Sequence, residues 1–253
     1  MNRSICVVPI SPMRAEPSHK SEQVSQLVFG DTCTIVESNG DFCKVISMYD
    51  DYIGWCQKVQ LQSAPDEAAY FPTVLVDTWV GAVRINQELM QVPLGSNIGF
   101  VKNGNVSLNG LQISTAAKGM EVRLKPDVKK MIEVAHAYLN TAYQWGGRSV
   151  FGVDCSGFTQ MVYKFGGIRL HRDASQQATQ GVVVDFLQEV TFGDLAFFDN
   201  EEGRITHVGI MLDSNRIIHA SGKVRIDAMD HAGIMNTESG ERTHKLRIVK
   251  RVM

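Results

Sequence analysis

The first half of the chain alternates short apolar runs with turn residues. Runs that alternate with a period of two, bounded by glycine, asparagine or aspartate, are typical of β-strands. Such runs occur at residues 24–29, 32–37, 42–48 and 52–55. Between two of them, Asn39-Gly40 has the composition of a tight hairpin turn. Residues 1–62 are therefore predicted to form a small all-β barrel.

A weaker form of the same pattern follows. Residues 63–70 have the composition of a linker. After them, short β-type runs are again separated by turns, among them Asn103-Gly104 and Asn109-Gly110. We therefore expect a second small β unit within residues 63–124.

At residue 125 the spacing of apolar positions changes from strand-like to helical. Residues 128–135 and 158–165 each place apolar side chains at i, i+3, i+4 and i+7, the stripe of an amphipathic helix. Gly166-Gly167 ends the second helix. Strand-like runs follow at residues 195–198, 207–212, 216–220, 224–227 and 246–252. A helix pair followed by a run of strands predicts an α+β domain over residues 125–253.

Composition and charge narrow the possible partners. The 253 residues are 44% hydrophobic and 21% charged, as in ordinary globular proteins. The formal net charge is −2 and there is no basic run, so neither nucleic acid nor an anionic membrane is expected as a partner. No stretch has the length of a membrane span, and the N-terminus lacks the apolar core of a signal peptide. We expect a cytoplasmic monomer, although a chain that had lost an export signal would look the same.

The five cysteines fall into two groups. Cys6, Cys33, Cys43 and Cys56 lie at strand-like positions in the predicted first barrel, and Cys155 stands apart. Their number is odd and their spacing matches no zinc motif, so we expect reduced cysteines in the core. A Cys33–Cys43 bridge stays open as an alternative.

Cys155 is the candidate nucleophile. It falls in the first turn of the second predicted helix, with Asp154 placed as its N-cap. The positive end of a helix dipole favours thiolate over thiol. The position therefore suits a cysteine that attacks a substrate.

Two downstream histidines supply a candidate base and a group to orient it. His207 and His219 lie on predicted strands joined by the turn residues 213–215, so the two strands are expected to form a hairpin. One imidazole can then take the thiol proton while the second orients it. A zinc site formed by Cys155, His207 and His219 is the rival chemistry, but it lacks a close-spaced ligand pair. We expect no metal or other cofactor. The remaining histidines, expected to be surface or loop residues, are His19, His136, His171, His231 and His244.

Five motifs in the second half resemble those of the NlpC/P60 cysteine peptidases, papain-like enzymes that cleave cell-wall peptides. They are Tyr143-Gln144-Trp145-Gly146-Gly147, Asp154-Cys155-Ser156-Gly157-Phe158, Gly193-Asp194-Leu195-Ala196-Phe197-Phe198, His207-Val208-Gly209-Ile210 and Ile218-His219-Ala220-Ser221. The resemblance implies a triad of Cys155 as nucleophile, His207 as base and His219 as orienting group. It also implies that Tyr143 faces the nucleophile.

The first half resembles a bacterial SH3 domain, through Arg14-Ala15-Glu16-Pro17 and Tyr52-Ile53-Gly54-Trp55. It is similar to the first of two such domains in the YkfC-like γ-D-glutamyl-L-diamino acid endopeptidases, the dipeptidyl-peptidase VI type. The resemblance implies two SH3-like barrels, over residues 1–62 and 63–124, before a papain-like domain. It also implies that Glu22 and Tyr52 bind the free amine of the substrate's L-Ala. Their alternatives are a solvated loop carboxylate and a barrel core residue.

The same subfamily implies further substrate contacts around the nucleophile. Asp154 and Ser156 correspond to residues at the amine and peptide subsites, although Asp154 could be a helix cap alone. Ser175 corresponds to a serine near the γ-D-Glu carboxylate. Arg172 either adds charge there or is an exposed loop residue.

The implied reaction is hydrolysis of murein-derived tri- or tetrapeptides. The γ-D-Glu–L-Lys or γ-D-Glu–diaminopimelate bond of a free peptide with an unblocked L-Ala would be cut, releasing L-Ala-γ-D-Glu for peptidoglycan recycling. One alternative is an exported endopeptidase acting on intact peptidoglycan, with the SH3 units as wall anchors. Another is a wall-peptide-binding protein whose triad is occluded.

Overall fold

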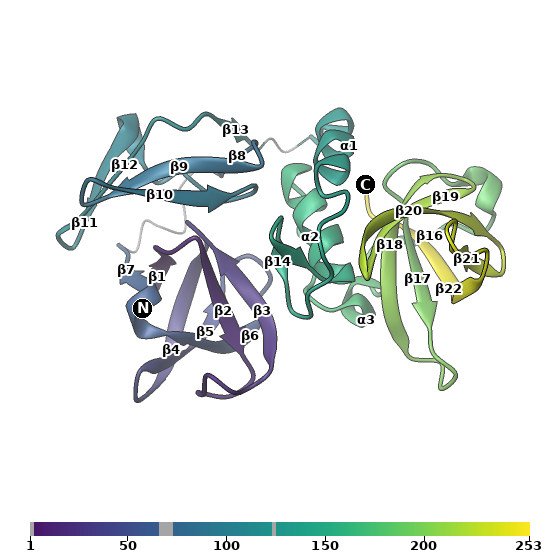
Figure 1. The fold of residues 1–253 in the computed structure, drawn as a ribbon, viewed down its shortest axis with the longest axis horizontal. Coiled ribbons are helices and arrows are strands. Elements are labelled where there is room, and N and C mark those ends of the chain that lie inside the picture. The colour runs from purple at the N-terminus through teal and green to yellow at the C-terminus, as the bar shows by residue number, and fades with distance from the viewer. Residues whose placement is uncertain (1–2, 66–72, 123–124) are drawn as a thin grey trace. The chain divides into compact units, whose positions relative to one another are not determined.

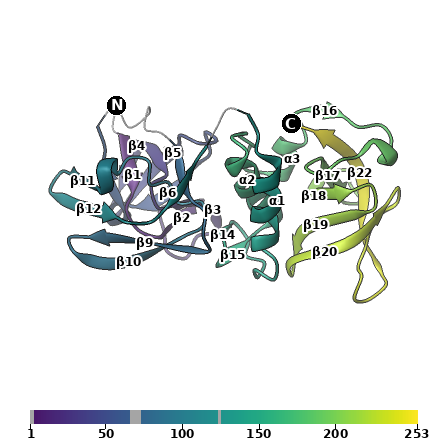
Figure 2. The same cartoon turned by 90° about the horizontal axis from the view of Figure 1, so that it is seen from above.

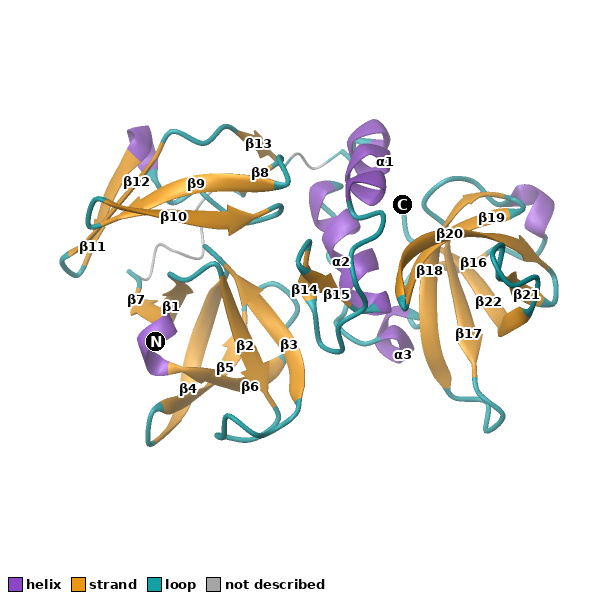
Figure 3. Cartoon of the chain, viewed as in Figure 1, coloured by secondary structure: helices purple, strands orange, loops and turns teal. Residues whose placement is uncertain are grey.

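The computed structural model describes residues 3–65, 73–122 and 125–253. The chain divides into two compact units, residues 1–124 with 145–151, and residues 125–144 with 152–253. Strands dominate and helices are few (Figure 3). Within the described ranges, no helix has the length and apolar character needed to cross a bilayer.

The N-terminal part of the first unit is a seven-stranded antiparallel sheet (Figure 1). Its order is β3-β2-β6-β5-β4-β1-β7. The strands are β1 (Arg3–Cys6), β2 (Ile10–Arg14), β3 (Gln23–Val28), β4 (Thr32–Asn39), β5 (Phe42–Ser47), β6 (Ile53–Gln57) and β7 (Leu61–Ser63), with the short helix η1 (Lys58–Gln60) before β7. Gly40 turns the β4–β5 hairpin with a φ of 53°, as the Asn39-Gly40 pair predicts. The four N-terminal cysteines are buried and free in the core of this sheet, so the Cys33–Cys43 bridge is not formed.

The next segment is also built of strands. They are β8 (Val74–Val76), β9 (Val80–Ile85), β10 (Glu88–Pro93), β11 (Asn105–Leu108), β12 (Leu111–Thr115) and β13 (Gly119–Glu121), with η3 (Lys102–Gly104) before β11. They form a four-stranded sheet, β10-β9-β12-β11, and a two-stranded sheet, β13-β8. Ile5 of β1 and Phe29, which follows β3, share a core with this segment. A boundary at residue 62 and a second SH3-like barrel stay predictions.

Residues 145–151 complete the first unit. They include the short strand β14 (Arg148–Ser149), which packs on β3. The buried Arg148 donates from Nη1 to the carbonyl of Gln26 at 2.7 Å and forms an ion pair with Asp31 at 3.4 Å. Although this segment lies only two residues after Tyr143 in the sequence, it belongs to the first compact unit.

Two helices open the second unit and confirm the helical periodicity. α1 (Val128–Ala137) has Asp127 as its N-cap, and the side chain of Asp127 accepts the N–H of Lys130 at 3.0 Å. α2 (Cys155–Phe165) packs against α1 and is buried at all of its 11 residues. The short strand β15 (Gly152–Val153) precedes α2, and the short helix α3 (Ala174–Gln177) follows it.

The rest of the second unit is a closed six-stranded barrel (Figure 2). Its strands are β17 (Leu195–Asp199), β18 (Ile205–Asp213), β19 (Arg216–Ser221), β20 (Lys223–Asp230), β21 (Gly233–Met235) and β22 (Arg242–Arg251). β22 pairs with both β17 and β21, which closes the ring, and β16 (Val182–Val183) pairs with β22 outside it. The short helix η4 (Leu187–Glu189) precedes β17. All five predicted strands are present, whereas the short β16 and β21 were not expected.

Candidate active site

Cys155 begins α2, as predicted, and α2 packs against β18 and β19 of the barrel. Asp154 is the N-cap, because its Oδ1 accepts the N–H of Gly157 at 2.6 Å. Hydrogen bonds from the backbone N–H groups of Val208 and Ser156 favour the thiolate. Burial opposes them, since Cys155 is only 6% exposed, and Asp154 adds a negative charge. Burial outweighs the other contributions and raises the pKa of Cys155 to about 12, although the N–H groups at the helix start favour the thiolate as expected.

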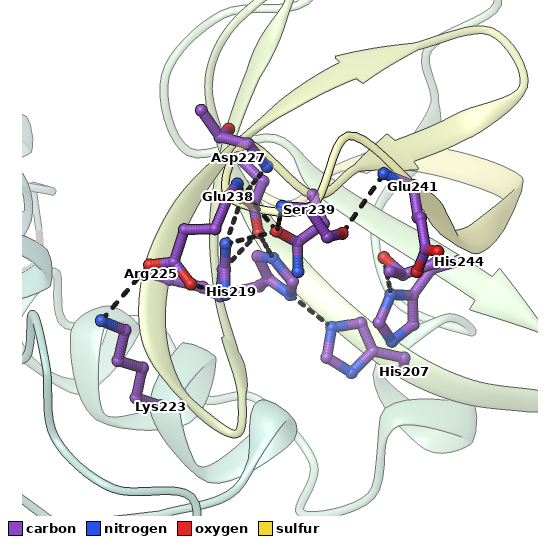
Figure 4. A network of polar contacts seen from close by, with 12 residues as sticks. His207, His219, Lys223, Arg225, Asp227, Glu238, Ser239, Glu241 and His244 are labelled. Carbon is purple, nitrogen blue, oxygen red and sulfur yellow. Dashed lines mark hydrogen bonds and ion pairs between the residues drawn. The ribbon is translucent and has the colours of Figure 1, made fainter.

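A chain of hydrogen bonds joins two histidines to an aspartate in the barrel (Figure 4). His207 Nε2 lies 2.8 Å from His219 Nδ1, and His219 Nε2 lies 2.9 Å from Asp227 Oδ2. The three residues come from the adjacent strands β18, β19 and β20, and all three are buried. The predicted β18–β19 hairpin is therefore confirmed. Gly209 faces His219 in its register, and a Cβ there would lie 2.8 Å from the His219 Cβ, so the pairing requires glycine.

Asp227 determines which ring nitrogens carry the protons in this chain of hydrogen bonds. Although burial opposes ionisation, hydrogen bonds from His219, Arg225 and the Thr237 N–H hold the pKa of Asp227 well below its usual range. An ionised carboxylate can only accept, so His219 carries its proton on Nε2. Its Nδ1 then accepts the Nε2 proton of His207. The lone pair of His207 is left on Nδ1, the ring nitrogen from which it can accept a proton.

Asp227 is itself held in place from the opposite side. Arg225 donates from Nε to Oδ2 at 2.6 Å and from Nη2 to Oδ1 at 3.0 Å. Arg225 also pairs with Glu238 at 3.1 Å and donates to Asn236 Oδ1 at 2.8 Å. Asp227 is a residue of the site that the sequence did not predict. An arginine and an aspartate two positions apart in the strand after His219 would have been the signal.

His244 belongs to the same cluster, so the expectation of a surface or loop residue was wrong for it. It lies on β22, half-buried, with its ring stacked on that of His207 at 4.2 Å between centroids and an interplanar angle of 28°. Burial, with His219, lowers the pKa of His244 to about 4. Burial, His219 and His244 also hold the pKa of His207 well below its ordinary value. The other four histidines, His19, His136, His171 and His231, are exposed as expected.

Arg172 is also part of the site. It is 1% exposed, which rules out the exposed loop arginine. Its guanidinium meets Asp154 Oδ2 at 2.6 Å and Oδ1 at 3.1 Å, and donates to Ser156 Oγ at 2.8 Å. Asp154 therefore combines the helix cap with a buried ion pair. Ser175 lies exposed on α3. The side chain that contacts Asp154 and Ser156 is that of Arg172.

Tyr143 approaches the nucleophile from the segment before α2. It forms a β-bridge with Val153, two residues before Cys155. Burial raises the pKa of the Tyr143 phenol, and the neighbouring Cys155 side chain and Asp154 carboxylate raise it further. Its half-buried hydroxyl therefore stays a hydrogen-bond donor at neutral pH.

Glu22 and Tyr52 belong to the first unit. Glu22 is exposed, and its Oε1 accepts the indole N–H of Trp145 at 2.6 Å. Trp145 is 62% exposed and also accepts, at its carbonyl, the amide of Gln23 at 3.0 Å. Tyr52 is half-buried against the core of the seven-stranded sheet. Trp145 as the partner of Glu22 is a contact that the sequence did not predict.

The zinc alternative has no support in the geometry. Among the residues that the structure describes, no group of three histidine, cysteine, aspartate or glutamate side chains is arranged to hold a metal ion. The polar groups of the site are arranged as a proton chain instead.

Two protein families match the chain. The NlpC/P60 family matches residues 140–242, and the bacterial dipeptidyl-peptidase SH3 domain matches residues 13–61. The γ-D-glutamyl-L-lysine dipeptidyl-peptidase of Bacillus cereus is 27% identical over 250 residues, covering 87% of this chain and 74% of that protein. Dipeptidyl-peptidase 6 of Lysinibacillus sphaericus is 25% identical over 268 residues, covering 90% and 92%. In fold, the chain is similar to the crystal structure of an NlpC/P60 family protein from Bacillus cereus, with a TM-score of 0.82 at 22% identity over 99% of each chain.

Proposed function

The chain carries an NlpC/P60 cysteine peptidase domain and a bacterial dipeptidyl-peptidase SH3 domain, and on that premise we propose that it is a γ-D-glutamyl-L-diamino acid dipeptidyl-peptidase. Its substrate would be a free murein tri- or tetrapeptide with an unblocked L-Ala. It would cut the bond from γ-D-Glu to L-Lys or diaminopimelate and release L-Ala-γ-D-Glu. The observation that carries this proposal is the ordered proton chain from His207 through His219 to Asp227.

The mechanism follows from the protons of that chain. The pKa of the Cys155 thiol is raised and that of His207 is lowered, so the resting pair is neutral. As the sulfur attacks the γ-carbonyl, its proton moves to His207 Nδ1, and the new charge on His207 is stabilised through His219 by Asp227. The Cys155 backbone N–H would donate to the oxyanion. His207 then protonates the leaving amine, and water hydrolyses the thioester.

The ammonium group of the substrate would be bound by a carboxylate. We assign Glu22 and Tyr52 to the ammonium, as the SH3 resemblance implies, with Trp145 holding one Glu22 oxygen and leaving the other to accept. Arg172 neutralises much of the Asp154 charge, so Asp154 would act mainly through the geometry of its pair with Arg172. Arg172 and Ser156 would instead favour a carboxylate or carbonyl of the peptide.

Domain organisation and cellular location complete the proposal. We infer that residues 63–124 form a second SH3-like domain and that the protein acts as a cytoplasmic monomer in peptidoglycan recycling. The five free cysteines suit a reducing compartment.

Product analysis tests the proposal. The protein is incubated with L-Ala-γ-D-Glu-L-Lys and with its N-acetylated form, and the products are identified by mass spectrometry, with Cys155→Ser as the control. We expect L-Ala-γ-D-Glu and lysine from the free peptide, roughly a hundredfold lower kcat/KM for the acetylated one, and no product from the variant. Equal rates on both peptides would refute the amine-dependent role, and full activity of Cys155→Ser would refute the nucleophile.

A further inference from the structure

Three histidine rings form one cluster in the barrel. His207 and His219 are hydrogen-bonded edge to edge, whereas His244 contacts His207 through its face (Figure 4). The centroid of the His244 ring lies 4.2 Å from that of His207 and 5.7 Å from that of His219. His244 comes from β22, a strand that supplies none of the proton-chain residues.

The hydrogen bond to His219 does not by itself fix the His207 ring. One hydrogen bond at Nε2 leaves the ring free to tilt about that contact, so the packing on its faces decides its plane. Phe198 packs at a tilt, with 5.7 Å between centroids, and His244 stacks almost parallel. Phe198 also packs edge-on against His244, which holds the stacking ring in turn.

Burial and the neighbouring His219 favour the neutral form of His244, whereas the carboxylate of Asp227 opposes it. The charged and titratable groups of the network are His207 on β18, His219 on β19, Lys223, Arg225 and Asp227 on β20, and Glu238 and Glu241 before β22. A second proton on His244 would place like charges 4.2 Å apart when His207 is protonated during turnover. When His244 is neutral, the contact between the face of its ring and the protonated ring of His207 is favourable instead.

We propose that His244 is a positioning residue for the catalytic base, whose neutral ring covers one face of His207 and keeps it in the plane that its hydrogen bond to His219 requires. This inference rests on the proposed roles of Cys155 and His207. The ring also shields His207 from water and thereby keeps the base neutral at lower pH.

The test compares His244→Ala, which opens the face, with His244→Phe, which keeps a stacking ring without a titratable nitrogen. For each protein two rates are measured from pH 4 to 9: alkylation of Cys155 by iodoacetamide, located by peptide mapping, and kcat/KM on L-Ala-γ-D-Glu-L-Lys. The alkylation rate reports the Cys155–His207 pair without requiring that the peptide be a substrate. Loss of peptide cleavage in the parent with normal alkylation would therefore refute the proposed substrate and leave His244 testable.

We expect His244→Ala to move the acid limb of both profiles to higher pH by about half to one unit, because hydration raises the pKa of His207. Its plateau kcat/KM should fall roughly threefold to tenfold, the scale of one aromatic pair. His244→Phe should keep the acid limb of the parent protein, and its plateau kcat/KM should stay within about twofold of the parent value. A role in stability alone would lower the melting temperature without moving the limb, and that result would overturn the proposal. A His244→Phe profile shifted as far as that of His244→Ala would overturn it too.

A measurement on the unsubstituted protein covers the case in which His244→Ala does not fold. NMR titration of the histidine ring nitrogens should show that His207 stays neutral well below the usual histidine range. An ordinary titration of His207 would contradict the shielding by His244.

Discussion

Replacing Asp227 by asparagine tests the proton chain at its far end. The carboxylate of Asp227 can only accept, which forces the proton of His219 onto Nε2. An asparagine can donate to that nitrogen instead. His219 would then carry its proton on Nδ1 and donate to His207 Nε2, which would move the His207 proton to Nδ1 and block the transfer from Cys155.

The size of the effect follows from the buried contact. His219 Nε2 and Asp227 Oδ2 are 2.9 Å apart and both side chains are almost fully buried. A hydrogen bond to a charged group contributes about 1.5–3 kcal/mol, so kcat/KM should fall roughly 10- to 150-fold. Steady-state cleavage of L-Ala-γ-D-Glu-L-Lys measures the loss, and circular dichroism checks that the variant is folded.

Asp230→Asn is the matched control. Asp230 lies three residues further along β20 and forms the same kind of two-oxygen pair with an arginine, Arg242, at 2.7 and 2.8 Å. Its replacement should leave kcat/KM within about twofold, because its pair does not include a histidine. A folded Asp227→Asn protein with kcat/KM within about threefold of the parent would show that Asp227 does not set the tautomers.

Further predictions concern the histidines and the first unit. His207→Ala should lower kcat more than His219→Ala on the same tripeptide, since only His207 transfers the proton; the reverse order would exchange their roles. The pKa of His244 is about 4 in the folded protein and higher in the unfolded chain. At pH values between the two, the unfolded chain therefore binds more protons at this residue than the folded protein does. Thermal stability should therefore fall from about pH 6.5 to pH 4, and less steeply in His244→Phe; equal slopes would contradict the shift. Glu22→Gln should slow cleavage of the free peptide and spare the acetylated one, so unchanged selectivity would exclude Glu22 from the amine site.

The elements around the site could be predicted because they are local. The 3.6-residue period over 158–165 and the turn before Arg216 identify α2 and the β18–β19 hairpin from neighbouring residues alone. Cys155, His207 and His219 lie on these elements. The comparisons confirm the resemblance to the NlpC/P60 family, whereas the roles of these three residues stay predictions. Asp154 as a helix cap is local in the same way.

What the sequence did not predict depends on contacts between distant strands. His244 reaches His207 only because β22 closes the barrel, 37 residues further along the chain. Residues 145–151 contact the rest of the first unit through Arg148 and Trp145. These contacts leave no periodic pattern in the sequence from which they could be predicted. The net shift in the pKa of the Cys155 thiol was not predictable either, because a helix start can be identified in the sequence and the degree of burial cannot.

Trapping of the acyl-enzyme tests the central claim most directly. The protein is mixed with L-Ala-γ-D-Glu-L-Lys, quenched in acid within the first turnovers, and digested for mass spectrometry. We predict a thioester of L-Ala-γ-D-Glu on the peptide that contains Cys155, and none in Cys155→Ser. Turnover of the tripeptide by the parent without this adduct, or the adduct on another residue, would contradict the account.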